Sequence, residues 1–453
     1  MARRFVDCDR ETPFLLPPSV QDWLPENHLA RFVVEIVSKL DLSPLVRAYA
    51  GRGSKAYHPS MLLSLLFYGY ATGVFSSRKL QAATYDSVAF RYVSGNVHPD
   101  HDTIAHFRKR FLTELKPLFV QILLIAQEMG LLKLGTVVLD GTKVKANASK
   151  HQALSWQYAC RLEQQLKDEV EALLALAEKA DHEESEQELD LPKELSRRED
   201  RLAVLKRAKK EIERRAAERF SKEREEWEAK MEERRRKEEM TGRKSGGPKP
   251  KPPPPGPRSR DQVNLTDEES RIMPTSGGGF EQAYNAQAAV DLDSMVIVES
   301  HLSQAPNDKQ QLTPALAELS DLPEELGSIE AVVADAGYFS RENVEACEQR
   351  GIDPYIATGR QQHNRPLAER LESPPILCDL SDPVERMGQR LKTADGRALY
   401  AKRKTTIEPT FGVIKSVMGF RQFLLRGFQA VQGEWDLVCL AFDLKRLHGL
   451  AMG

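Results

Sequence analysis

Apolar residues recur at helical spacing through the first 135 residues of the chain. Pro59 stands where a helix would begin, and apolar side chains follow it on one face, which predicts a buried helix. Ser77 and Asp102 can cap two further helices, because each precedes another periodic apolar run. The apolar positions after Pro59 are Met61, Leu62, Leu65, Leu66 and Tyr70. This first region therefore predicts several short amphipathic helices joined by turns.

Residues 152–240 show the same periodicity over a much longer stretch. Two long helices are expected, with a turn near 190–192 and apolar stripes that would let the helices pair as a hairpin. The next residues, 241–257, read TGRKSGGPKPKPPPPGP and cannot continue a helix, so they predict a linker. We expect the hairpin to be an insertion. It is either a solvated protrusion or an arm that binds DNA or a partner.

Short β-like runs appear from residue 134 onward. Residues 136–139 form an apolar, β-branched run that ends in Asp140, and residues 331–334 form another that ends in Asp335. Strands alternating with helices, after an antiparallel hairpin, predict a mixed α/β sheet. The other expected elements are strands at 283–290, 295–299 and 354–357, and helices near 309–319 and 340–350.

Charge is concentrated in one window of the 453 residues. Positions 150–260 hold 28 Lys/Arg and 25 Asp/Glu, although the formal net charge of the chain is only −2. The near-neutral total excludes a uniformly basic nucleic-acid coat, but local patches leave DNA binding open. The five cysteines contain no CxxC pair, so they predict neither a disulfide framework nor a zinc site. With no signal-like start and no apolar run of about 18 residues, we expect a soluble cytoplasmic protein without membrane contact.

Three carboxylates are candidates for metal-dependent chemistry. Asp140 and Asp335 end strands, and Glu408 lies seven residues before Lys415, so an acid and a base share one helical face. Pro409 predicts that this helix begins at or beside Glu408. Each group also has a plain structural explanation as a turn former, a helix cap or a surface ion pair. Three such acids nevertheless suit phosphoryl transfer with two Mg²⁺ ions.

Basic side chains gather near these acids and on the first region. Between residues 400 and 426 there are six positive residues and only one acid. We expect a polyanion to bind at this stretch. Near residue 110, basic residues lie on the last predicted helix, which is typical of a helix-turn-helix-like DNA-binding module. A helical bundle with a solvent-exposed basic face also explains them. The basic residues are Lys402, Arg403, Lys404, Lys415, Arg421 and Arg426, with Arg108, Lys109 and Arg110 in the first region. The nearby cluster of His98, Asp100, His101, Asp102 and His106 could bind a metal, but capping aspartates account for it.

Several segments together resemble the DDE transposases of bacterial insertion sequences. They are HPSMLLSLLFYGY, HDTIAHFRKRF, LDGTKVKA, YNAQAAVD, VVADAGYFS, GIDPYIATGR, IEPTFGVIKSVMGFRQFLLRG and LAFDLKRLH. The resemblance implies a helical DNA-binding domain at 1–133. It also implies a ribonuclease-H-like catalytic domain at 134–150 and 261–448, interrupted by the charged insertion at 151–260. The expected fold is therefore mixed, with helical and α/β parts.

The same resemblance assigns roles to the candidate residues. It places the acidic triad on Asp140, Asp335 and Glu408, with Lys415 as the lysine of a Tyr–Arg–Glu–Lys signature. It implies Mg²⁺ or Mn²⁺, two ions, as cofactor, and terminal inverted repeats and target DNA as partners. It further implies a homodimer on paired ends and association with the nucleoid.

The signature is displaced here by one residue. The family's arginine stands four positions before the glutamate, where this chain has Lys404, while Tyr400 and Arg403 keep their mutual spacing. If the helix starts near Pro409, Arg403 can keep its role. If the helix runs back through the segment, Lys404 shares the face of Glu408. The displacement leaves two other hypotheses: a catalytically inactive DNA-binding derivative, and an interaction protein built around the charged hairpin.

Overall fold

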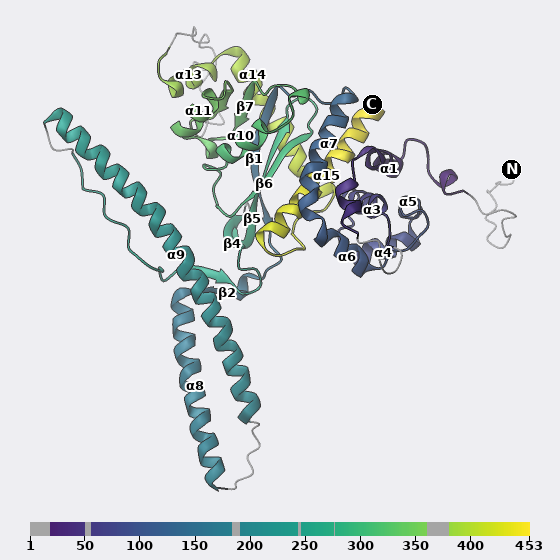
Figure 1. Cartoon of the computed structure of the whole chain (residues 1–453). Coiled ribbons are helices and arrows are strands. Elements are labelled where there is room, and N and C mark those ends of the chain that lie inside the picture. The colour runs from purple at the N-terminus through teal and green to yellow at the C-terminus, as the bar shows by residue number, and fades with distance from the viewer. Residues whose placement is uncertain (1–18, 50–55, 184–190, 243–245, 276, 360–379) are drawn as a thin grey trace, which may run out of the picture. The chain divides into compact units, whose positions relative to one another are not determined.

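The computed structural model describes residues 19–49, 56–183, 191–242, 246–275, 277–359 and 380–453. By its internal contacts the chain forms two compact units. Unit 1 comprises Met1–Val144 and Tyr284–Gly453, and unit 2 comprises Lys145–Ala283. The combination of helices with a mixed sheet confirms the fold class expected from the sequence (Figure 1).

Unit 1 begins with the expected series of helices. Asp100, and not Asp102, caps the last basic helix: its carboxylate accepts the backbone N–H groups of Asp102 and Thr103 at 2.9 Å. Ser77 is likewise the first residue of its helix and not its cap. In both cases the helix starts earlier than its apolar periodicity indicated. The helices are α1 (Leu29–Lys39), α2 (Ser43–Arg47), α3 (Pro59–Ala71), α4 (Ser77–Asp86), α5 (Val88–Val93), α6 (His101–Arg110) and α7 (Leu115–Glu128).

The sheet of unit 1 is mixed, as predicted. Its strands lie in the order β6-β5-β1-β7-β8, with β5 and β6 antiparallel and β1, β7 and β8 mutually parallel. The predicted strands are present, although β1 is ten residues long, so Asp140 lies within it instead of at its end. The strands are β1 (Thr136–Lys145), β5 (Gly279–Asp291), β6 (Ile297–Ser303), β7 (Ala331–Ala334) and β8 (Asp353–Ile356).

Helices follow or cover these strands. α15 packs against β6, α3 and α7, and so joins the N-terminal helices to the sheet within unit 1. Ser340 caps α11 through the N–H of Asn343, as the sequence predicted. The remaining helices of unit 1 are α10 (Leu312–Ser320), α11 (Arg341–Glu348), α13 (Pro383–Arg390), α14 (Ala394–Gly412), a π-helical segment (Val413–Val417) and α15 (Phe428–Met452).

The buried face of α15 carries three carboxylates, and each has a polar partner. Glu434 accepts the N–H groups of Leu424 and Leu425 at 2.9 Å, and Asp443 accepts that of Ile297 at 2.8 Å. Asp436 accepts bonds from the side chains of Ser300 and Gln432. Buried polar groups cost free energy unless they are bonded, so these contacts determine how α15 lies on β6.

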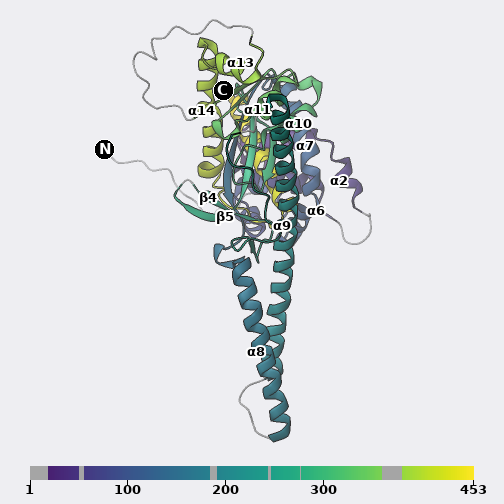
Figure 2. The ribbon, with the colours of Figure 1, turned by 90° about the vertical axis from the view of Figure 1, so that its left-hand side faces the viewer.

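Unit 2 contains the predicted helical hairpin. α8 (Trp156–Glu183) and α9 (Leu191–Thr241) run side by side in both views (Figures 1 and 2). Their contact is apolar near the base, where Leu166, Leu205 and Ile212 are buried together with Val263. The short strands β2 (Ala153–Ser155) and β3 (Gln262–Asn264) pair antiparallel beneath them, and β4 (Arg271–Thr275) pairs with the first residues of β5.

The Gly/Pro-rich segment does not behave as a free linker over its described residues, 246–257. It returns along α9 and its carbonyl groups accept bonds from that helix: Trp227 Nε1 reaches Pro250 O at 3.0 Å, and Arg234 Nη1 reaches Pro248 O at 3.1 Å. Proline carbonyls are free to accept because the segment makes no helix or sheet of its own. As the sequence predicted, the described residues form no helix, and they connect α9 to β3 while packing along α9.

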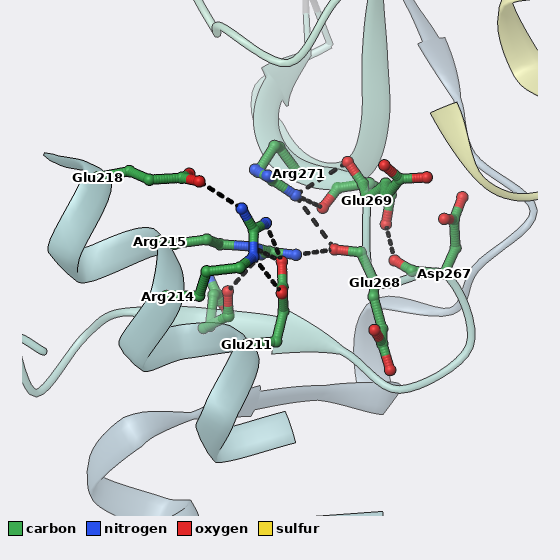
Figure 3. Close-up of polar contacts among 10 residues, drawn as sticks. Glu211, Arg214, Arg215, Glu218, Asp267, Glu268, Glu269 and Arg271 are labelled. Atoms are coloured by element: carbon green, nitrogen blue, oxygen red, sulfur yellow. Dashed lines mark hydrogen bonds and ion pairs between the residues drawn. The ribbon is translucent and has the colours of Figure 1, made fainter. Parts of the chain in front are cut away.

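A polar network holds the 267–271 loop against α9 (Figure 3). Arg215 donates to Glu268 O, and Arg271 Nη1 donates to Glu268 O, Glu269 O and Ser270 O at 2.9–3.1 Å. Glu211 bonds both Arg214 and Arg215 along the helix. Arginine side chains thus satisfy loop carbonyls that no sheet partner satisfies.

None of the helices in the described residues combines the length and apolarity that a membrane span requires.

We predict that Asp436→Asn stabilises the protein in a pH-dependent way. Burial raises the pKa of Asp436 to about 7, so the stability that the carboxyl contributes is complete below the unfolded-state pKa of about 3.9 and is lost as the pH rises from there through about 7. At pH 8 the variant should gain about 1–4 kcal/mol of unfolding free energy, because one pKa unit corresponds to about 1.4 kcal/mol. At pH 5 the gain should be less than half as large, because the loss begins at the unfolded-state pKa of about 3.9 and is only partly complete there.

Thermal unfolding at pH 5 and pH 8 measures this effect. Asp293→Asn, at an exposed aspartate, is the matched control and should change neither value. Destabilisation by Asp436→Asn at pH 8 would mean that the ionised carboxylate is stabilising where it lies.

Candidate active site

Parallel pairing of β1 with β7 brings the first two candidate acids together. Leu139 pairs with Ala334, so Asp140 and Asp335 are the next residues along adjacent strands. Asp335 leaves the sheet at this point and caps a 3-10 turn, Ala336–Tyr338, by accepting the N–H of Gly337 at 2.7 Å. Two carboxylates 195 residues apart in the chain thus become neighbours.

The environment of Asp140 disfavours its charge. Burial, followed by the charge of Asp335, raises the pKa of Asp140 to about 6. The N–H of Gly141, at 2.8 Å, and Arg403 Nη1, at 3.1 Å, act in the opposite direction. Burial and the charge of Asp335 together outweigh these two contacts in their effect on the pKa of Asp140.

Arg403 reaches this site although α14 does not begin where the sequence predicted. The helix runs from Ala394 to Gly412 with Pro409 inside it, so the expected start at Glu408 is wrong. Arg403 nevertheless contacts Asp140 with a side chain only 11% exposed, while Lys404 is exposed. The half-buried Tyr400 lies beside Arg403, and burial raises the pKa of its phenol. The tyrosine and arginine that kept their mutual spacing are thus the two that lie at the acids.

Glu408 is the acid that the structure does not bring to the pair. It is exposed on α14 and, within the described residues, makes no hydrogen bond or ion pair. Consistently, the described part of the chain contains no group of three or more His, Cys, Asp or Glu side chains placed to hold a metal ion. The residues around His98 therefore do not form a metal site either. His98 stacks on Tyr85, with ring centroids 3.8 Å apart, and Asp100 is a helix cap.

Lys415 lies at the site but its ammonium is already bonded. Nζ donates to the Thr142 hydroxyl and, at 3.1 Å, to the backbone carbonyl of Lys143, which ties the π-helical segment to β1. π-Helical turns are uncommon and frequently accompany functional sites. Arg421 bonds Lys415 O at 2.9 Å through Nε, and both Arg421 and Arg426 are exposed.

The basic residues of α6 do not form one exposed patch. Arg108 is buried and donates to Tyr70 Oη and Phe75 O, both at 3.0 Å, so its prediction as a DNA contact is corrected. Lys109 and Arg110 are exposed. The buried face of the helix takes Arg108 because Tyr70 supplies a polar partner there.

Sequence reasoning missed a polar cluster beside the acids. Asp308 accepts bonds from Asn285 Nδ2 at 2.6 Å and Gln287 Nε2 at 2.7 Å, and Lys143 lies 3.5 Å from it. Tyr338 donates to Gln287 from the other side. One signal was available: the two amides alternate within the otherwise apolar strand YNAQAAVD, so both point to one buried face.

The carboxylates fit divalent cations only in part. Asp140 and Asp335 offer adjacent oxygen donors whose repulsion a hard cation would relieve. Their adjacency follows from the pairing of β1 with β7, and it is what suits the two carboxylates to a shared cation. Glu408, the third candidate, is exposed on α14 and the structure does not bring it to the pair.

Comparison with known families gives two matches. Residues 18–110 match the family model described as Transposase domain (DUF772), and residues 255–444 match the model described as Transposase DDE domain. The second match contains Asp335 and Glu408, whereas Asp140 lies before the helical hairpin and outside it. Neither the curated proteins nor the solved structures that were compared give a match.

We predict that Gly141→Ala disrupts the polar cluster. A Cβ at Gly141 would lie 2.1 Å from Gln287 Nε2 and 2.6 Å from Asp308 Oδ1, so the Gln287–Asp308 bond would have to break. The cost should be about 1–3 kcal/mol of unfolding free energy. Denaturant unfolding measures it.

Gly135→Ala is the matched control, because a Cβ there meets nothing within 4 Å. Equal effects of the two variants would show that backbone flexibility, and not the contact with Asp308, is what Gly141 provides.

Proposed function

The chain belongs to the DDE transposases of insertion sequences, and from that premise we propose that Asp140, Asp335 and Glu408 form its catalytic triad. As a transposase it acts on DNA, cleaving and joining strands. We propose that it cleaves the terminal inverted repeats of its own element and joins the exposed ends to target DNA.

One observation carries the assignment: Asp140 and Asp335 adjoin on parallel strands, and Arg403 contacts Asp140 from α14. Glu408 belongs to the same helix as Arg403, five residues further along. Transfer of phosphoryl groups needs acids that hold cations close to positive side chains that hold phosphates. The mixed sheet with acids on neighbouring parallel strands supports a ribonuclease-H-like assignment for residues 134–150 and 261–448.

Divalent metal ions serve this family generally. We propose that the triad carboxylates hold two Mg²⁺ or Mn²⁺ ions here. Such ions, when bound, activate the attacking water or 3′-hydroxyl and stabilise the leaving oxygen.

The chain's own residues orient the acids and the DNA. Arg403 holds the carboxylate of Asp140 in position through its hydrogen bond, and the half-buried Tyr400 contacts the side chain of Arg403. Lys415 secures the π-helical segment to β1, so that the exposed Lys404, Arg421 and Arg426 can receive backbone phosphates.

The other parts of the chain receive roles by the same proposal. Residues 1–133 bind the repeats, with Lys109 and Arg110 of α6 at phosphates. Residues 151–260 form the inserted hairpin. Two copies of the chain act together on paired ends at the nucleoid, because both ends of one element must be joined.

Strand cleavage of a plasmid carrying the element's own ends, with Mg²⁺ or Mn²⁺, tests the triad. Asp140→Asn, Asp335→Asn and Glu408→Gln should each lower cleavage by at least ~100-fold, because each removes a metal-binding charge. DNA binding, measured by fluorescence anisotropy, should persist in all three.

Glu385→Gln, at an exposed glutamate of α13, is the matched control and should cleave at the wild-type rate. Undiminished cleavage by Glu408→Gln would remove that residue from the triad, and undiminished cleavage by Asp140→Asn would refute the metal assignment altogether.

A further inference from the structure

Asp308 is a further carboxylate close to the aspartate pair, supplied by the loop between β6 and α10. Its Oδ1 atom accepts bonds from the amide groups of Asn285 and Gln287, at 2.6 and 2.7 Å. Both amides come from β5, the strand next to β1. These two bonds satisfy Oδ1 and fix the carboxylate in place.

Two glycines show where Asp308 lies relative to β1 and to Asp335. A Cβ at Gly141, the residue after Asp140, would lie 2.6 Å from Asp308 Oδ1. A Cβ at Gly337 would lie 2.9 Å from Asp335 Oδ1 and 3.8 Å from Asp308 Oδ2. Asp308 therefore lies close to Asp335, and it borders β1 at Gly141, on the face opposite to that of the Asp140 side chain.

Lys143 is the cation that pairs with Asp308. Its Nζ atom lies 3.5 Å from Asp308 Oδ1, and its side chain is only 19% exposed. Burial lowers the pKa of Lys143, while the charges of Asp308, Asp140 and Asp335 each raise it. The ammonium is thus a positive charge within electrostatic reach of Asp140 and Asp335.

The Lys143–Asp308 contact is not needed to satisfy Asp308. The amides already provide two shorter hydrogen bonds to the same oxygen, and 3.5 Å is long for a charged pair. Asp308 instead determines where the ammonium stands relative to the two metal-binding aspartates. A lysine without this anchor could approach them directly.

We propose that Lys143 and Asp308 together set the affinity of the Asp140–Asp335 pair for divalent metal: Lys143 opposes the cation, and Asp308 holds Lys143 aside. Both are positioning residues, and the proposal rests on the proposed function of Asp140 and Asp335 as metal ligands. The positive charge of Lys143 partly neutralises the two aspartates before a metal ion binds, and it weakens metal binding because it repels the ion.

The signs of the expected effects follow from the charges. Lys143→Met should tighten Mn²⁺ binding by roughly threefold to thirtyfold, because a competing positive charge is removed. Lys143→Arg should bind Mn²⁺ as the wild type does. Asp308→Asn should weaken binding, because an acid is lost and Lys143 is released toward the pair.

Mn²⁺ titration of the full chain without DNA, followed by the electron paramagnetic resonance signal of free Mn²⁺, measures these affinities directly. The double variant Lys143→Met/Asp308→Asn completes a cycle. If Asp308 acts through Lys143, the weakening caused by Asp308→Asn should shrink in the Lys143→Met background. Lys143→Gln repeats the test if the methionine variant does not fold.

Lys145→Met and Glu281→Gln are the matched controls, since Lys145 is also on β1 and also lies 3.5 Å from its acid. Neither should change Mn²⁺ affinity. Two results would overturn the proposal. The first is that folded Lys143→Met and Lys143→Gln bind Mn²⁺ no more tightly than the wild type. The second is that Asp308→Asn has an effect of equal size in both backgrounds. Failure of the proposed function is distinct: Asp140→Asn would then bind Mn²⁺ as tightly as wild type.

Discussion

The parallel pairing of β1 with β7 is the constraint on which the site depends. Val137, Val138, Val332 and Val333 are essentially unexposed, so both faces of the two strands are packed and their register is well specified. A shift of one residue would turn every side chain to the opposite face of the sheet. The same register that buries the valines therefore places Asp140 next to Asp335.

Adjacent carboxylates then determine the character of their surroundings. Burial and mutual repulsion disfavour the charge of Asp140, and the chain offsets that cost with Arg403 from α14 and Lys143 from β1 itself. The pKa of Asp140 nevertheless stays raised, chiefly because the carboxyl is buried. A site in this condition favours the entry of further positive charge, which is a physical reason for it to bind metal.

Elements with local signals could be predicted from the sequence. β7 occupies the predicted residues, Ser340 caps α11, and the hairpin helices follow their apolar stripes. The start of α14 could not be predicted, because the rule that proline disfavours the interior of a helix considers only the neighbouring residues. Here the helix continues through Pro409, whose missing N–H is offset by the burial of Ile407 and Phe411 around it.

Contacts that depend on tertiary packing could not be predicted from the sequence either. Asp308 lies in a loop, and nothing in its neighbouring residues indicates that amides from β5 will hold it at the acids. Arg108 belongs to a basic run that is typical of an exposed face, yet Tyr70 and Phe75 accept its guanidinium inside the helical region. In each case a partner more than 20 residues away decides the role of the side chain.

The helical hairpin explains why so large a separation in sequence leaves the acid pair intact. The boundary between the two units falls within β1 and within β5, so the strands that leave and re-enter the sheet are themselves the base of the insertion. Within unit 2 that base is closed by backbone pairing, including Ala146 N–H to Gln282 O at 2.8 Å. Doubling the length of a closed loop costs only about 0.6 kcal/mol. Once the base is paired, the length of the hairpin beyond it has little effect on whether Asp140 meets Asp335.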